Sequence, residues 1–278
     1  MTDSTQPKER KQQVASGFNL ASAGYDKPAL GFLCACAKRL AEFAGLQSGQ
    51  KILDIATGTG TAAIAAAKII GQGDIIAVDL AQDMLEQARQ KITAAGITNI
   101  QLQLEDAEKL SFGDNSFDAA ICASGIFFLP DMLAGLQEWR RVTQPGGVVA
   151  FSSFTSNAFK PMSDIFNAQI EKYGVQTKSV GGRLATPEMC LNLMIEAGFE
   201  EIEIQTEQLG YYLNGVDQWW DIVCNAGFRI RLSQITPEKL AQFKVEHLAE
   251  IETLKTEEGI WLDFEAIFVK GRKPNFSE

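Results

Sequence analysis

A glycine-rich turn that begins with a carboxylate is the strongest chemical signal in this sequence of 278 residues. The segment from Asp54 to Gly60 stands where a short apolar run gives way to an alanine-rich one. Glycine at such a turn lets the backbone approach a ligand closely, and the start of a following helix presents N–H groups to it. The turn predicts a nucleotide-type cofactor, but the spacing Gly58-x-Gly60-x-x-Ala63 also satisfies the dinucleotide fingerprint and leaves the cofactor open.

Further carboxylates bear on which cofactor this is. Asp79 ends the next apolar run, about 20 residues after the last glycine, where a carboxylate reaches a ribose diol in nicotinamide and S-adenosylmethionine sites alike. Asp54, inside the strand end and four residues before Gly58, is positioned to face a cationic ammonium group. The pair Glu105 and Asp106 follows the third strand and could accept a hydrogen bond from an adenine amine. These last two features favour S-adenosylmethionine.

The elements that must position these groups alternate between strand and helix. An amphipathic helix over Pro28 to Gly45 comes first, and short apolar runs then alternate with helical patterns in the manner of βαβ units with a parallel sheet. Together they predict a doubly wound core over about residues 29–154. The expected strands are 51–56, 74–79, 100–104, 117–122 and 147–153, and the expected helices are 62–70, 84–95 and 132–142.

The C-terminal part predicts a helix at Pro187 to Ala197, strands at Glu201 to Gln205 and Trp261 to Lys270, and a helical insertion over about 214–258. The insertion is too long for an ordinary connection, which indicates a functional cap. We therefore expect an N-terminal arm or lid at 1–28, an α/β domain at 29–271 with cap segments at 155–186 and 212–260, and a tail at 272–278.

Composition restricts the partners. The net charge of −10 and the pI of about 4.8 disfavour binding to phosphate backbones, so we expect a small-molecule acceptor and no nucleic-acid partner. The N-terminus is polar from Met1 to Gln13 and no stretch of about 18 residues lacks charge, which predicts no signal peptide and no membrane insertion. Five cysteines without zinc-ligand spacing indicate reduced thiols in a cytoplasmic protein and no metal site. They are Cys34, Cys36, Cys122, Cys190 and Cys224.

Taken in order, these motifs resemble those of class I S-adenosylmethionine-dependent methyltransferases. The runs that carry the resemblance are 52–60, 77–79, 105–107, 117–121 and 144–147. The arm segments Val14 to Phe18 and Ala23 to Asp26 are similar to those of the ubiquinone/menaquinone C-methyltransferase branch, also called methyltransferase type 11.

The resemblance implies a Rossmann-like, seven-stranded, mostly parallel sheet in the order 3-2-1-4-5-7-6, with the helical cap between the last two strands. It also implies S-adenosyl-L-methionine as the cofactor and S-adenosyl-L-homocysteine as the product. With Asp54 added from the turn itself, the expected cofactor-binding residues are Tyr25, Asp54, Ala56, Thr57, Gly58, Gly60, Asp79, Leu80, Met84, Asp106, Ala107, Cys122 and Ala123.

Two departures from the family pattern matter. Ala56 replaces the first glycine of the turn, which should be tolerated if its φ angle stays negative. Phe127 and Phe128 stand where many relatives have histidine, so a general base after the fourth strand is missing and the acceptor site should be apolar. We expect the arm and the cap to close over a floor made by these two rings. The expected substrate pocket comprises Phe18, Phe127, Phe128, Trp219, Trp220 and Phe228.

His247 is the only histidine and shares a helix face with apolar residues between Pro237 and Leu254. A packed imidazole is the favoured interpretation, and His247 stays the one candidate catalytic base. Three other functions stay open: a nicotinamide-dependent oxidoreductase, which would need a Tyr-x-x-x-Lys motif or a placed histidine, a macromolecule methyltransferase, and a non-catalytic binding module. Methyl transfer itself requires positioning and exclusion of water rather than a covalent nucleophile, and the atom methylated, C, O or N, is left undecided.

Overall fold

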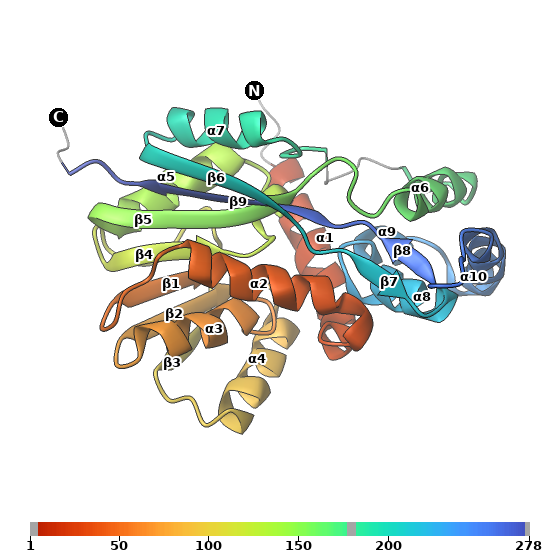
Figure 1. Ribbon diagram of the computed structural model, residues 1–278, viewed down its shortest axis with the longest axis horizontal. Coiled ribbons are helices and arrows are strands. Elements are labelled where there is room, and N and C mark those ends of the chain that lie inside the picture. Colours follow the sequence, from red (N-terminus) through yellow and green to blue (C-terminus); the bar gives the residue numbers. More distant parts are fainter. Residues whose placement is uncertain (1–4, 177–181, 276–278) are drawn as a thin grey trace.

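A seven-stranded sheet forms the centre of the computed structural model, which describes residues 5–176 and 182–275 (Figure 1). The strand order is β3-β2-β1-β4-β5-β9-β6, and only β9 runs antiparallel to its neighbours. Because β9 is the last strand of this sheet along the chain, the expected order 3-2-1-4-5-7-6 is confirmed. The strands are β1 (Lys51–Ile55), β2 (Asp74–Asp79), β3 (Ile100–Leu104), β4 (Phe117–Cys122), β5 (Thr143–Phe154), β6 (Glu200–Gln208) and β9 (Glu265–Arg272).

Successive apolar residues of the strands point to opposite faces of the sheet, as β geometry requires. Ile52 belongs to the core cluster beneath α2 and α3, whereas Leu53 belongs to the cluster beneath α5 and α7. Burial on both faces explains why these strands are almost continuously apolar in sequence. The helices of this part are α2 (Gly31–Phe43), α3 (Thr61–Ile70), α4 (Gln82–Ala94), α5 (Met132–Val142) and α7 (Pro187–Glu196).

The strand expected from Trp261 to Lys270 is divided in the structure. Its first residues form β8 (Ile260–Leu262), which pairs with β7 (Tyr211–Leu213) in a separate two-stranded sheet. The break is fixed by the Gln208 side chain, whose amide donates to Asp263 while its Oε1 accepts from the Gly210 and Phe264 N–H groups. Strand β5 starts four residues earlier than expected because Thr143 pairs with Phe117 ahead of a register shift.

The remaining helices gather beyond the carboxyl ends of the parallel strands, on the right in Figure 1. The insertion between β6 and β9 consists of β7, α8, α9, α10 and β8, and α6 follows β5. Helix α1 was not expected from the polar arm sequence; it crosses behind the strand ends and contacts α8 and α9. These elements are α1 (Thr5–Ala21), α6 (Met162–Lys172), α8 (Val216–Asn225), α9 (Arg229–Leu232) and α10 (Pro237–Glu252), with short 3-10 turns at Ser22–Gly24, Pro28–Leu30 and Ile126–Phe128.

None of the helices in the described part of the chain combines the length and the apolar character that crossing a membrane requires. The five cysteines are free thiols. In the same described ranges, no group of three or more His, Cys, Asp or Glu side chains is placed to hold a metal ion.

Candidate functional site

The turn between β1 and α3 has a left-handed backbone at Gly58 and Gly60, with φ angles of 55° and 79°. Ala56 also has a positive φ, 53°, so the negative angle on which the tolerance of alanine was expected to depend is not found. The methyl group of Ala56 is accommodated because Gly125 faces it: a Cβ added at Gly125 would lie 2.7 Å from the Ala56 Cβ. The backbone at Ala56 thus has the left-handed conformation that glycine usually adopts, and the alanine side chain makes this conformation sterically unfavourable.

Asp79 locks this turn to the end of β2. Its Oδ2 accepts the Gly58 N–H at 2.8 Å, and its Oδ1 accepts the Ala81 N–H at 2.8 Å. Burial raises the pKa of Asp79, and these N–H donors oppose that rise. The Gly58 N–H is therefore engaged by a carboxylate rather than free for a ligand, and Asp79 keeps lone pairs that can accept further hydrogen bonds.

Asp54 lies behind the turn and is fully buried. Its Oδ2 accepts a 2.6 Å hydrogen bond from the Thr57 hydroxyl, whereas Oδ1 is buried with no partner among the described residues. Burial raises the pKa of Asp54 to about 7. The carboxylate is thus held by the Thr57 hydroxyl and lines none of the three cavities that surround the turn.

Three cavities meet above the strand ends. The Asp106 cavity, of about 90 Å³, lies over the ends of β2 and β3, and the Thr57 cavity, of about 270 Å³, lies between the glycine turn and the start of α2. A third, the aromatic cavity, of about 310 Å³, opens toward the cap. Tyr25 and Ser124 are the two residues that line all three, so they mark the point where the cavities join.

Ser124 is fixed at this junction by unusual backbone geometry. Its φ is 55°, and its N–H donates to the Ser152 hydroxyl at 2.9 Å. The Cys36 thiol, on α2, donates to the same hydroxyl at 3.2 Å. A left-handed, non-glycine residue held by buried partners at a cavity junction is typical of a functional position.

Most of the expected cofactor residues lie together around these cavities. The Asp106 cavity is lined by Tyr25, Ala56, Gly58, Asp79, Leu80, Met84, Asp106, Ala107 and Ala123, and Thr57 lines the Thr57 cavity. Gly60 and Cys122, like Asp54, line neither: Gly60 packs toward Ala88 of α4, and the Cys122 side chain lies in the core beneath α5.

Lys11 is a residue of this site that the sequence analysis missed. Its ammonium contacts the carboxylates of Asp106, at 2.6 Å, and Glu108, and its side chain lines the Asp106 cavity. The Asp106 carboxylate expected for an adenine amine is therefore paired with a lysine from α1. No sequence signal pointed to Lys11, because it is one of several charges in a polar arm.

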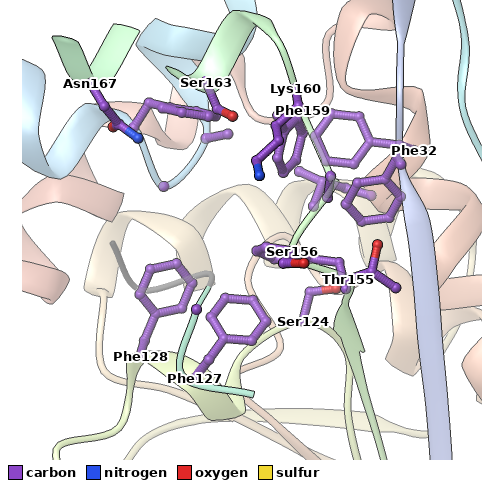
Figure 2. Close-up of a pocket in the computed structure, with 18 of the residues that line it drawn as sticks. Phe32, Ser124, Phe127, Phe128, Thr155, Ser156, Phe159, Lys160, Ser163 and Asn167 are labelled. Carbon is purple, nitrogen blue, oxygen red and sulfur yellow. The ribbon is translucent and has the colours of Figure 1, made fainter. Parts of the chain in front are cut away.

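The aromatic cavity contains four of the six residues expected for the acceptor pocket: Phe18, Phe127, Phe128 and Phe228. Figure 2 shows Phe127 and Phe128 side by side at one side of the cavity, with Phe32 and Phe159 across from them. The rings of Phe18 and Phe128 meet edge to face at 5.0 Å, which brings α1 against the loop after β4. Phe159, missed by the sequence analysis, bridges to Phe228 of the cap at 5.5 Å.

Trp219 and Trp220 lie outside this cavity. The indole N–H of Trp219 donates to Nε2 of His247 at 2.8 Å, because a fully buried indole requires an acceptor. Trp220 packs near Phe243, with Lys244 over its ring. Both tryptophans therefore pack within the cap and do not line the acceptor pocket.

His247 belongs to the same cap core. Its Nδ1 lies 3.0 Å from Oε1 of Gln169, to which it donates as the neutral tautomer, and its ring stacks on Phe243 at 5.5 Å. Burial lowers the pKa of His247 to about 4. The imidazole is neutral, both of its nitrogens are hydrogen-bonded, and it does not line the aromatic cavity. These observations agree with the interpretation of His247 as a packed side chain.

Comparisons with known proteins place this arrangement in a family. The sequence profile of a methyltransferase domain matches residues 52–147. The aklanonic acid methyltransferase DauC of Streptomyces sp. (strain C5) is 34% identical over 144 residues, which is 51% of this chain and 66% of that protein, just under two thirds of its length. The ubiquinone/menaquinone biosynthesis C-methyltransferase UbiE of Bdellovibrio bacteriovorus is 30% identical over 204 residues, covering 66% of this chain and 86% of that protein.

A solved structure from Bacillus halodurans C-125, described as a candidate methyltransferase, has the same fold, with a TM-score of 0.59 and 25% identity. The alignment covers 86% of this chain and 99% of that one. With the motif order, the strand order and these relatives in agreement, the chain belongs to the class I S-adenosylmethionine-dependent methyltransferases, in the branch of the ubiquinone/menaquinone C-methyltransferases.

Proposed function

We propose that this protein transfers the methyl group of S-adenosylmethionine to a small aromatic or otherwise apolar acceptor held in the aromatic cavity. The observation that carries the proposal is the meeting of that cavity with the Asp106 and Thr57 cavities at Tyr25 and Ser124. A methyl group delivered from the cofactor side at this junction would enter a chamber lined mainly by phenylalanine rings.

The residues present fit this cofactor. Asp79 retains acceptor capacity for ribose hydroxyls, and Leu80 and Met84 provide an apolar surface for a base. A Cβ added at Gly58 would lie 3.7 Å from the Tyr25 ring, so a side chain there would fill the space between turn and arm. When bound, S-adenosylmethionine would supply an electrophilic methyl group on a positively charged sulfur.

The protein's own task is then to orient the acceptor and to exclude water. Phe18 of α1 lines both the aromatic and the Asp106 cavities, so the arm covers the junction from one side. No histidine or cysteine lines the aromatic cavity; its titratable side chains among the described residues are Tyr25, Lys160, Asp164 and Arg231. Such a site suits an acceptor that is already nucleophilic, such as an activated carbon, a phenolate, an enolate or a neutral amine.

Relatives and charge support a small acceptor over a macromolecule. The named relatives act on aklanonic acid or in ubiquinone and menaquinone biosynthesis. The net charge of −10 opposes binding to nucleic acid, and the aromatic cavity has the volume and apolar lining of a small-molecule pocket.

The test is binding by calorimetry. The protein should bind S-adenosylmethionine and S-adenosylhomocysteine but not NADH, and Asp79→Ala should weaken both by about 1.5–3 kcal/mol, the range for a hydrogen bond to a charged group. The matched control is Asp83→Ala, an exposed carboxylate at the start of α4 that lines none of the three cavities. Equal affinity for NADH, or an unchanged dissociation constant in Asp79→Ala, would contradict the proposal.

A further inference from the structure

The aromatic cavity has a polar end. Figure 2 shows Ser124, Phe127 and Phe128 at the side of the strand ends, while Lys160, Ser163 and Asn167 lie across the cavity on α6 and the segment before it. Ser124 marks the junction with the cofactor-side cavities. The polar side chains therefore lie at the end of the pocket that is remote from methyl transfer.

Arg231 of α9 lines this same end. Its Nη1 donates to Oδ1 of Asn167 at 2.5 Å, and its guanidinium carbon lies 5.1 Å from the ring centre of Phe166 and 5.5 Å from that of Phe228. Only one of its five donors has a hydrogen-bond acceptor among the described residues. The guanidinium thus lies near two aromatic rings and keeps its remaining donors available.

Neither Arg231 nor Lys160 forms an ion pair with a carboxylate in the described part of the chain, although ion pairs occur elsewhere on the protein. In Figure 2 the Lys160 amine points into the cavity. Burial lowers the pKa of Arg231 to about 10, which leaves it charged at neutral pH. A partly desolvated cation gains from a nearby anion, so the Arg231 guanidinium is suited to bind one.

The charges that face the cavity sum to a single positive charge. Arg231 is half-buried, whereas the side chains of Lys160 and of Asp164, the one acidic residue of the lining, are exposed. One net positive charge beside a planar guanidinium suits a carboxylate, which guanidinium binds through two parallel hydrogen bonds, better than a doubly charged phosphate.

We propose that the acceptor is a ring compound that carries a carboxylate at the end opposite the methylated atom, and that Arg231, with Lys160, binds this carboxylate. The inference rests on the proposed function, because it assigns the ligand of the same pocket. Arg231 is then a specificity-determining residue: it fixes which end of the acceptor faces Ser124 and does not touch the reacting atoms.

The experiment compares matched probes on the full chain saturated with S-adenosylhomocysteine. The probes are 3-hydroxybenzoate against 3-hydroxybenzamide, and 3-hydroxy-2-naphthoate against its amide, with dissociation constants measured by calorimetry. The unaltered protein should bind at least one carboxylate about tenfold or more tightly than its amide, as expected for hydrogen bonds to a charged group. Arg231→Met should abolish this preference while leaving amide affinity within about threefold, and Arg231→Lys should retain part of it.

The matched control is Arg229→Met, on the same helix but not on the cavity wall, which should keep the full preference. Thermal unfolding of each variant separates loss of binding from loss of fold. Carboxylates that bind no more tightly than amides, or not at all, to protein that does bind S-adenosylhomocysteine would overturn the inference. The same holds if the preference survives in the double variant Arg231→Met, Lys160→Met. Failure to bind S-adenosylhomocysteine would instead refute the proposed function.

Discussion

Ala56 is an alanine in a backbone conformation that favours glycine. Its φ of 53° places Cβ near the following carbonyl, and only the absence of a side chain at Gly125 leaves room for it. The strain lies beside the junction of the three cavities, where Ser124 has a similar φ of 55°. Two strained residues at one point indicate that the shape of the junction is kept at the expense of stability.

Ala56→Gly should therefore stabilise the protein by about 0.5–1 kcal/mol, because relief of left-handed strain exceeds the entropy gained by the unfolded chain. Chemical denaturation at constant pH measures this. The control Ala65→Gly, in the interior of α3, should lose about 1 kcal/mol. A loss in both variants would show that Ala56 is not strained.

His247 makes the stability of the protein depend on pH. Burial lowers its pKa to about 4 from the ordinary 6.5, so between these values the unfolded chain binds a proton that the folded chain does not. The stabilising contribution is complete above pH 6.5 and is lost as the pH falls toward 4.

When the pH falls from 7 to 5, His247 should lower the free energy of unfolding by about 2 kcal/mol. The difference between the pH profiles of the unaltered protein and His247→Gln isolates its contribution from that of the carboxylates. Turnover by His247→Gln should stay within about tenfold once an acceptor is known, since the imidazole lines no cavity. Parallel pH profiles would show that His247 titrates normally.

At the scale of elements, α1 packs closely against the cap because Gly17 has no side chain. A Cβ added at Gly17 would lie 2.5 Å from Cγ1 and 3.1 Å from Cα of Ile230 in α9. Elsewhere on α1, the Lys11 ammonium reaches Asp106, and the Asn19 side chain accepts the N–H of Asp83. The helix thus connects the cap with the cofactor side of the sheet.

Gly17→Val should displace α1 and weaken S-adenosylhomocysteine binding by roughly tenfold, because Lys11 and Phe18 move with the helix. The energy is that of a few lost contacts, about 1–2 kcal/mol, and the sheet should stay folded. Ser16→Ala, on the exposed side of the same turn, is the control. Unchanged affinity in Gly17→Val would mean that the arm does not contribute to the cofactor site.

At the scale of the whole molecule, one apolar core runs from the sheet into the cap. Phe32 of α2 contacts Phe159 and Phe264, and Phe159 contacts Phe228, which in turn meets Trp219 at 5.3 Å. Such continuity makes independent movement of the cap costly, because it would expose these rings. Helix α1 meets the loop after β4 through the Phe18 ring, 5.0 Å from Phe128, so its opening would expose less apolar surface than movement of the cap.

Amide hydrogen exchange should show this division. Saturation with S-adenosylhomocysteine should slow exchange in α1 by about tenfold, equivalent to about 1.4 kcal/mol, while α7, remote from the cofactor cavities, changes by less than about twofold. Equal protection of both helices would indicate global stabilisation rather than closure of the arm.

The sequence by itself predicted the strands of the sheet and the glycine turn, and the family resemblance of its motifs implied the strand order that the structure has. The strands and the turn follow from local signals, namely apolar runs of strand length and glycines at the turn, and a parallel sheet gathers carboxylates such as Asp79 at one edge. What only the tertiary structure decided depends on long-range contact. Lys11 contacts Asp106, Arg231 contacts Asn167, and Trp219 contacts His247 rather than the pocket. The two residues of each pair are far apart in the sequence, and no periodic pattern predicts their contact. The sign of φ at Ala56 belongs there too, since it depends on the space that Gly125 leaves on another strand end.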